Sequence, residues 1–126
     1  MAKLVKKQQS KEPDFLPNTL RMAAVAAEHK AINLKAYDVR ELTIMADSFV
    51  ICSAGSEPQL KAIYSAVREE MREIGLKPLH SEGALNGNWL LLDYGNLIFH
   101  VFRKEAREFY DLDGLWADAP EVKLDV

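Results

Sequence analysis

The stretch "NWLLLDYGNLIFHVF", residues 88–102, restricts the possible folds of this chain more than any other segment. Gly95-Asn96 stands between two apolar runs, which predicts a β-hairpin with a two-residue turn whose first position needs a positive φ. Tyr94 then pairs with Leu97, and strand alternation divides the side chains between two faces. The face that we expect in the core carries Leu90, Leu92, Tyr94, Leu97, Phe99 and Val101. The second face carries Trp89, Leu91, Asp93, Ile98, His100 and Phe102.

The segments before the hairpin alternate between helical and strand patterns. Asn18 is a plausible N-cap for a helix that runs to about Lys30. Residues 34–39 predict a strand, residues 41–47 a turn or short helical piece, and residues 48–54 a strand that is apolar on both sides and therefore covered on both.

The clearest helix signals lie in residues 56–75. Ser56 and Gln59 have the spacing of a capping box, Pro58 lies in the first turn, and Gly75 supplies the stop. A short strand at 77–81 and a loop at 82–88 lead into the hairpin. The segment after residue 103 indicates one short helix, a turn and an acidic tail. Helices interleaved with about five strands predict an α/β fold with a mixed sheet in a single domain.

Composition limits the class of protein and the kind of partner. The chain has 126 residues, with 16 Lys and Arg against 19 Asp and Glu, a net charge of −3, so extensive nucleic-acid binding is disfavoured. Residues 1–17 indicate a flexible basic extension, residues 18–120 the domain, and residues 121–126 a C-terminal tail. Cys52 lies in an apolar run and is expected to be buried. We expect neither a signal peptide nor a membrane span, hence a cytoplasmic protein.

Catalytic interpretations find little support in the spacing of the residues. The common phosphate, zinc and nucleophile motifs are absent. Gly55-Ser56 at a helix start could hold a phosphate, but the Asp-x-Asp at residues 111–113 lies far downstream in a turn, where a metal-dependent transferase would need it on a strand. This spacing argues against metal-dependent transfer, and we expect the chain to need no metal or cofactor.

Asp93 and His100 lie diagonally on the second hairpin face, within reach of a hydrogen bond, and resemble half of a nucleophilic triad. Cys52 is expected to be buried and no serine is placed nearby, so the alternative is a polar pair that fixes the sheet surface. The whole second face is either an open docking surface with aromatic anchors or a surface closed by the first helix or the C-terminal segment. The residue pattern leaves both possibilities open.

Four segments together resemble one family, the ribosomal silencing factors RsfS, also called Iojap-like. They are "ADSFVICSAGSEPQLKAI", "GLKPLHSEG", "WLLLDYGNLIFHVF" and "REFYDLDGLWADAP", and the resemblance runs from about residue 22 to residue 120. It implies an α/β fold with nucleotidyltransferase-like topology that lacks the catalytic carboxylates, and hence a protein that is not an enzyme. It also implies binding to the large ribosomal subunit through large-subunit ribosomal protein number fourteen, which blocks joining of the small subunit and represses translation. Large-subunit assembly is the alternative role.

The resemblance also implies a site. We expect the partner contact to come from the second hairpin face, with the apolar side chains as anchors and Asp93 meeting a Lys or Arg. The residues assigned to it are Trp89, Leu91, Asp93, Ile98, His100 and Phe102. Tyr110 and Trp116 are expected to pack the C-terminal segment onto the body. Away from the ribosome the chain could form a homodimer.

Overall fold

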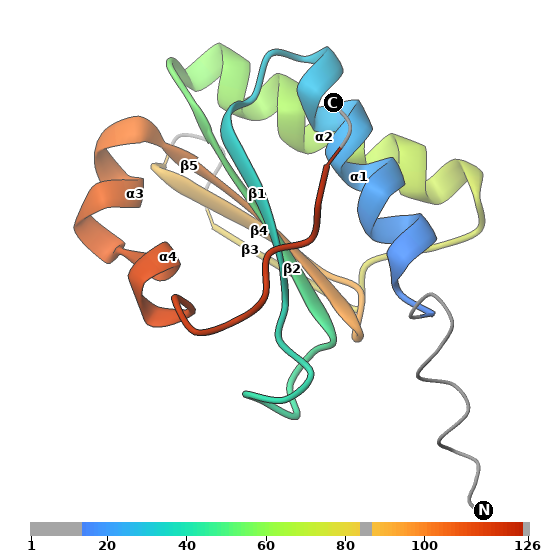
Figure 1. Cartoon of the computed structure of the whole chain (residues 1–126). Helices are drawn as coiled ribbons and strands as arrows, with labels where there is room; N and C mark the ends of the chain where they lie inside the picture. Colours follow the sequence, from blue (N-terminus) through green and yellow to red (C-terminus); the bar gives the residue numbers. More distant parts are fainter. Residues whose placement is uncertain (1–13, 84–86, 125–126) are drawn as a thin grey trace, which may run out of the picture.

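The computed structural model describes residues 14–83 and 87–124, which form a five-stranded sheet with helices on both faces (Figure 1). The expected single α/β domain with a mixed sheet is confirmed. The strands are β1 (Ile32–Asp38), β2 (Ser48–Ala54), β3 (His80–Glu82), β4 (Trp89–Asp93) and β5 (Leu97–Arg103). The helices are α1 (Leu16–Glu28), α2 (Glu57–Glu73), α3 (Lys104–Tyr110) and α4 (Leu112–Leu115).

The sheet is mixed, with the strand order β1-β2-β5-β4-β3. β2 and β5 are parallel neighbours, and the other pairs are antiparallel. Every residue of β2 is buried, which confirms that this strand is covered on both faces. β5 is buried from Leu97 to Phe102, so the two parallel strands form the centre of the molecule.

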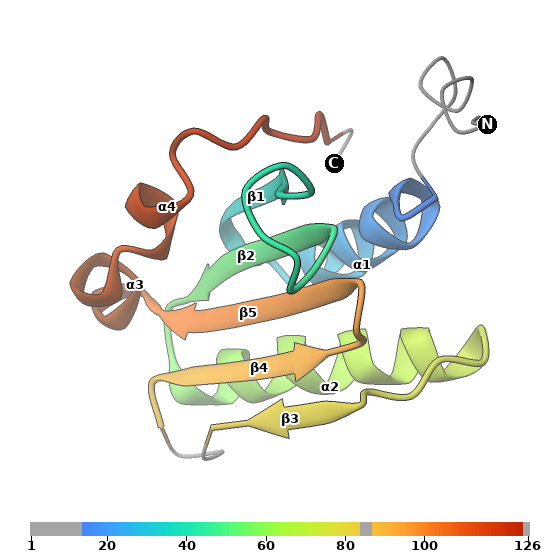
Figure 2. The same ribbon diagram turned by 90° about the horizontal axis from the view of Figure 1, so that it is seen from below.

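α1 and α2 cover one face of the sheet and enclose the larger core (Figure 2). α2 follows the expected pattern, since Leu60, Ile63, Val67 and Met71 form its buried stripe. Gly75 ends the segment with φ at 89°. α1 differs at its start: it begins at Leu16 with Phe15 in the N-cap position, so the prediction that Asn18 caps the helix is wrong. Phe15 is buried, and this burial fixes the start of α1 in place of a polar cap.

The hairpin register is the one that the sequence predicts. Tyr94 donates its backbone N–H to the Leu97 carbonyl at 2.9 Å, and Gly95 has φ at 93°. Trp89 lies opposite Phe102 and Asp93 opposite Ile98. The expected core face is closed, since Leu90, Leu92, Leu97, Phe99 and Val101 are each no more than 1% exposed.

Two other strand predictions are correct in place but shifted along the chain. β1 begins two residues before the predicted segment, and residues 41–47 form the turn that joins it to β2. β3 occupies residues 80–82. Its position is set by pairing to Leu91, Leu92 and Asp93 of β4, and not by the apolar residues that precede it.

The C-terminal segment crosses the second face of the sheet. It contains two short helices in place of the predicted one, since Asp111 adopts a left-handed conformation (φ 50°) between α3 and α4. The segment then returns to the β1 edge, where Val122 donates to the Ala36 carbonyl at 2.8 Å. Residues 121–122 therefore cover part of an edge strand.

Arg107, on α3, joins this segment to the sheet and is only 5% exposed. Its guanidinium donates to both carboxylate oxygens of Asp113 at 2.8 and 3.1 Å, to the Asn33 carbonyl at 2.6 Å and to Ser53 Oγ at 3.0 Å. Tyr37 donates its hydroxyl to the same Asp113 carboxylate at 2.9 Å. These bonds connect α3, α4, β1 and β2 through one side chain.

We expect Arg107→Met to lower the free energy of unfolding by about 2 kcal/mol, less than for a fully buried pair because water reaches part of Asp113. Urea unfolding measures this change. Arg72→Met is the control, since it removes an ion pair to Glu69 in which both side chains are more than half exposed, and it should change stability little. Equal stabilities of the two variants would contradict the role given to Arg107.

Candidate functional site

At the helix start Gly55-Ser56, the best candidate for a phosphate site, the side chains of Ser56 and Gln59 bind the backbone. Gln59 accepts a hydrogen bond from the Gly55 N–H at 2.7 Å through its side-chain oxygen, and its side-chain amide donates to the Lys30 carbonyl at 2.8 Å. Ser56 Oγ accepts from the Gln59 N–H at 3.2 Å. The predicted cap is thus present, but its reciprocal bond goes to Gly55 rather than to Ser56. The N–H groups of Gly55 and Gln59, which a phosphate at this helix start would need, are therefore bonded within the chain.

The Asp-x-Asp at residues 111–113 also has structural partners. Asp111 accepts from the Gly114 N–H at 3.1 Å, and Asp113 binds Arg107 and Tyr37. The pKa of Asp113 is lowered: burial alone would raise it, but the hydrogen bonds from Arg107 and Tyr37 outweigh that effect. Within residues 14–83 and 87–124, no three His, Cys, Asp or Glu side chains are grouped so that they could hold a metal ion.

Asp93 and His100 share a face, but they bond to different groups. Asp93 Oδ1 accepts from the Gly95 N–H at 2.7 Å and so stabilises the hairpin turn. His100 Nδ1 lies 3.3 Å from the Trp89 indole N–H, which can only donate, so this nitrogen is the acceptor. Burial lowers the pKa of His100 to about 4. The predicted hydrogen bond between the two is therefore replaced by two local ones, and the imidazole is neutral.

The second hairpin face is divided between its two strands. On β5, Ile98 is 6% exposed, His100 5% and Phe102 1%. Ile98 and Phe102 belong to a second apolar cluster, which also contains Ala106 and Ala119 of the C-terminal segment, and His100 contacts Phe49 edge-to-face with ring centroids 5.3 Å apart. The expectation that these three residues touch a partner directly conflicts with their burial, because the C-terminal segment already covers them.

On β4, in contrast, Trp89, Leu91 and Asp93 are half-buried. Figure 2 shows α1 and α2 behind the sheet and the described helices α3 and α4 beside the end of β5, so that the front of β4 and β3 lies outside the helical cover. Pairing to β4 brings His80 opposite Asp93 and Glu82 opposite Leu91, on the same face. We call these five residues, His80, Glu82, Trp89, Leu91 and Asp93, the β4 surface.

Trp89 is held in place by the buried residues beneath it. Its ring stacks on Phe102 with centroids 5.7 Å apart and on His100 at 6.0 Å. The bond to His100 Nδ1 fixes the orientation of the indole. A large aromatic side chain that is already ordered loses little conformational entropy on binding, and such side chains are frequent hot spots. The β4 surface therefore has the properties of a docking site for a protein.

Of two residues that hold the C-terminal segment in place, the sequence predicted one and not the other. Trp116 was expected to pack the C-terminal segment, and it does so in an edge-to-face contact with Phe49 at 5.1 Å. Arg107 was missed, because no spacing rule links an arginine on one helix to Asn33 and Ser53, more than fifty residues earlier. The side chain of Tyr110 lies outside the described part of the chain.

Comparisons with known proteins agree on one family. Residues 13–126 match the family model described as "Ribosomal silencing factor during starvation". The Ribosomal silencing factor RsfS of Bacillus subtilis (strain 168) is 36% identical over 107 residues, which cover 84% of this chain and 91% of that protein. The chloroplastic protein Iojap of Zea mays is 31% identical over 116 residues, which cover 90% of this chain and 49% of that protein.

Solved structures show the same fold. A crystal structure of a Bacillus halodurans protein is 31% identical, with a TM-score of 0.74 over 86% of this chain and 99% of that one. A Chromobacterium violaceum protein, 24% identical, superposes with a TM-score of 0.80 over 90% of this chain and 94% of that one. In the described part of this chain, every helix is too short or too polar to cross a membrane. Because one relative is chloroplastic, location varies among similar proteins.

Burial of neutral His100 predicts a specific loss of stability in mild acid. The folded pKa, about 4, lies below the ordinary value of 6.5, so the unfolded chain binds a proton that the folded chain excludes. This contribution is complete above about pH 6.5 and is lost as the pH falls toward 4. We expect the free energy of unfolding to drop by about 2 kcal/mol between about pH 7 and pH 5 for this reason.

Urea unfolding at the two pH values measures this drop. His100→Phe keeps the apolar contacts of the buried ring and removes the titrating group, so its drop should be smaller. Asp38 and Asp113, whose pKa values are lowered from 3.8, act below this window. The same pH dependence in both proteins would contradict the assignment to His100.

Proposed function

The chain belongs to the family of ribosomal silencing factors, and on that premise we propose that it binds the large ribosomal subunit and prevents the small subunit from joining. The partner is large-subunit ribosomal protein number fourteen, and the contact is made by the β4 surface. The consequence is repression of translation. The observation that carries the proposal is the half-buried row of Trp89, Leu91 and Asp93 on the uncovered part of the sheet.

The composition of the β4 surface supports a protein partner. Trp89 and Leu91 supply an aromatic and an aliphatic anchor, while Asp93 and Glu82 place carboxylates beside them. Such a surface combines an apolar centre with a polar margin, as protein interfaces do. His100 and Phe102, on the neighbouring strand, contribute indirectly by keeping Trp89 in one orientation, and Ile98 lies opposite Asp93.

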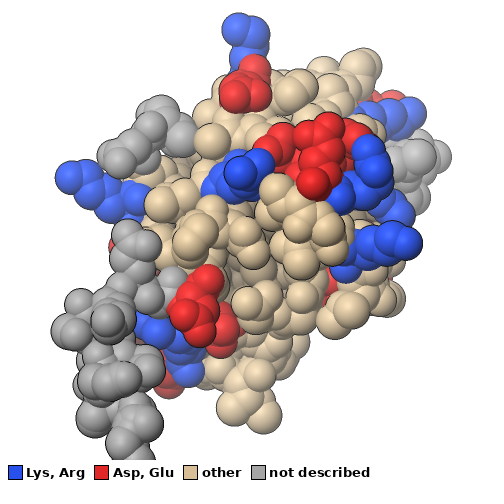
Figure 3. Space-filling view, turned by 90° about the vertical axis from the view of Figure 1, so that its right-hand side faces the viewer, with Lys and Arg blue, Asp and Glu red and all other residues tan. Residues whose placement is uncertain are grey.

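The net charge of the chain also supports a basic partner. The chain is acidic, with a net charge of −3. On the side of α1 and α2, acidic side chains gather with basic ones next to them (Figure 3). Glu70 pairs with Arg21 and Glu69 with Arg72 on that side, and on the β4 surface Glu82 lies 2.8 Å from His80 Nε2. The acidic net charge therefore favours a basic ribosomal protein as partner, while the anchors Trp89 and Leu91 select the face.

The mechanism needs no bond to be made or broken. A chain that binds only the free large subunit lowers the fraction of that subunit able to join, in proportion to its concentration over its dissociation constant. The two features with a catalytic appearance fit this role: Ser56 caps a helix and Asp113 anchors the C-terminal segment. The protein acts by occupying a surface.

Substitutions on the β4 surface test the proposal. We expect Leu91→Ser and Asp93→Asn each to weaken co-sedimentation with purified large subunits by about tenfold or more, as hot-spot substitutions do. Asp93→Asn removes the charge and keeps an oxygen that can accept from the Gly95 N–H, so the turn is preserved. Trp89→Ala should abolish binding, with a partial loss of stability because two ring contacts disappear.

Glu28→Gln is the matched control, since Glu28 is exposed at the end of α1 on the other side of the sheet. It removes the same charge and should bind normally. In a joining assay with purified subunits, the unmodified chain should reduce formation of joined ribosomes, and Leu91→Ser should not. Normal binding by the folded Leu91→Ser and Asp93→Asn variants would refute the assignment of the site.

A further inference from the structure

The loop between β1 and β2 exposes three large apolar side chains within four residues. Leu42 is 47% exposed, Met45 69% and Ile44 fully exposed. Removing such side chains from water is favourable, so a cluster of them on a surface is typical of an interaction site. The proposal of the preceding subsection makes no use of this loop.

Local bonds hold the loop in one shape. The N–H groups of Leu42 and Thr43 both donate to the Val39 carbonyl, at 3.0 and 3.1 Å, and Met45 donates to Thr43 Oγ1 at 3.1 Å. Val39 is 0% exposed and Ala46 4%, so buried residues anchor both ends. The apolar side chains are therefore presented by an ordered backbone, which lowers the entropic cost of docking.

The loop adjoins the end of the β4 surface. The N–H groups of Asp47 and Ser48 donate to the Asn96 carbonyl at 2.8 and 3.2 Å. Asn96 belongs to the hairpin turn that follows Asp93, and Asp93 itself binds the Gly95 N–H in that turn. The hairpin turn thus connects the loop to the β4 surface, so a single partner could touch both.

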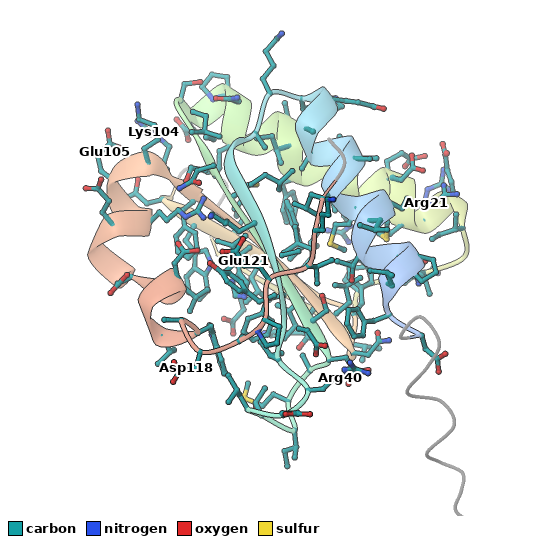
Figure 4. All side chains as sticks on the ribbon, in the orientation of Figure 1. Arg21, Arg40, Lys104, Glu105, Asp118 and Glu121 are labelled. Atoms are coloured by element: carbon teal, nitrogen blue, oxygen red, sulfur yellow. The ribbon has the colours of Figure 1, made fainter. Side chains whose placement is uncertain are left out.

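Acidic groups surround the apolar side chains. From Asp38 to Asp47 the sequence has three carboxylates and one guanidinium, that of Arg40. Arg40 donates to both carboxylate oxygens of Asp38 at 2.9 and 2.7 Å, and the nearby Asp47 and Glu41 also raise its pKa. Arg40 and Asp118 lie at this same end of the molecule (Figure 4). A hollow of 200 Å³ beside Leu42 is lined by Asp38, Glu41, Asp118 and Pro120.

We propose that the 42–45 loop is a second anchor for the ribosomal partner, with Ile44 and Met45 inserted against a basic protein surface next to the one that the β4 surface contacts. The inference rests on the proposed function and extends its footprint around the hairpin turn. Basic groups of the partner would meet Glu41 and Asp118, and the apolar side chains would supply the buried centre. The negative charge around the loop disfavours an anionic lipid or RNA phosphate as the occupant.

The double substitution Ile44→Ser and Met45→Ser tests this anchor. Both side chains face water in the free chain, so stability should be unchanged. We expect the dissociation constant for purified large subunits to rise by about tenfold or more, mostly through faster dissociation. Ile32→Ser is the matched control: Ile32 is an exposed apolar residue at the opposite end of β1, and its variant should bind normally.

The outcomes separate the two proposals. If the loop variant binds normally while Leu91→Ser does not, the loop inference is overturned and the β4 surface stands. If the unmodified chain does not bind large subunits, the proposed function fails and the loop inference fails with it. If the loop variant binds normally but changes a free dimer into a monomer in analytical ultracentrifugation, the loop serves self-association and the inference is likewise overturned.

Discussion

The parallel pairing of β2 with β5 determines how every other element must be placed. Both strands are buried along almost their whole length, so each face of the sheet centre needs a cover. α1 and α2 supply one cover and enclose the larger core. The C-terminal segment supplies the other, with Arg107 bonded to the carbonyl of Asn33 and to Ser53. This segment packs against the centre of the second face.

This distribution explains why the candidate site lies on β4. The β1 edge is partly covered by residues 121–122, while the two strands beyond β5 extend past the C-terminal segment. Antiparallel strands tolerate a face directed to water, and β4 alternates between buried and half-buried side chains. The surface that the fold leaves open is therefore a direct result of where its helices are required.

The sequence predicted the hairpin register correctly because the apolar alternation and the Gly95-Asn96 turn are local signals that agree. It could not divide the second face between its two strands, since burial of His100 and Phe102 depends on a segment that follows in the chain and folds back over them. The residue pattern left open whether this face is exposed or covered. In the structure it is covered on β5 and open on β4.

Asn18 was misassigned for a related reason, because burial of Phe15 is a tertiary contact. The exposed loop at residues 42–45 was predicted only as a turn or short helical piece, since an apolar residue pattern does not reveal whether a partner or the core will cover the side chains.

Stability and recognition share residues at one place, the stack of Trp89 on His100 and Phe102. The rings of His100 and Phe102 are buried, Phe102 belongs to the second apolar cluster, and the indole beside them is the aromatic anchor of the β4 surface. His100 accepts the indole N–H only while it is neutral, and its burial keeps it neutral at physiological pH. The side chain that first resembles a catalytic histidine thus supports recognition indirectly, by fixing the ring that a partner would meet. Because the C-terminal segment provides that burial, the bonds of Arg107 also support the position of Trp89. Arg107 binds Ser53, Ser53 lies opposite Phe102, and Phe102 lies opposite Trp89.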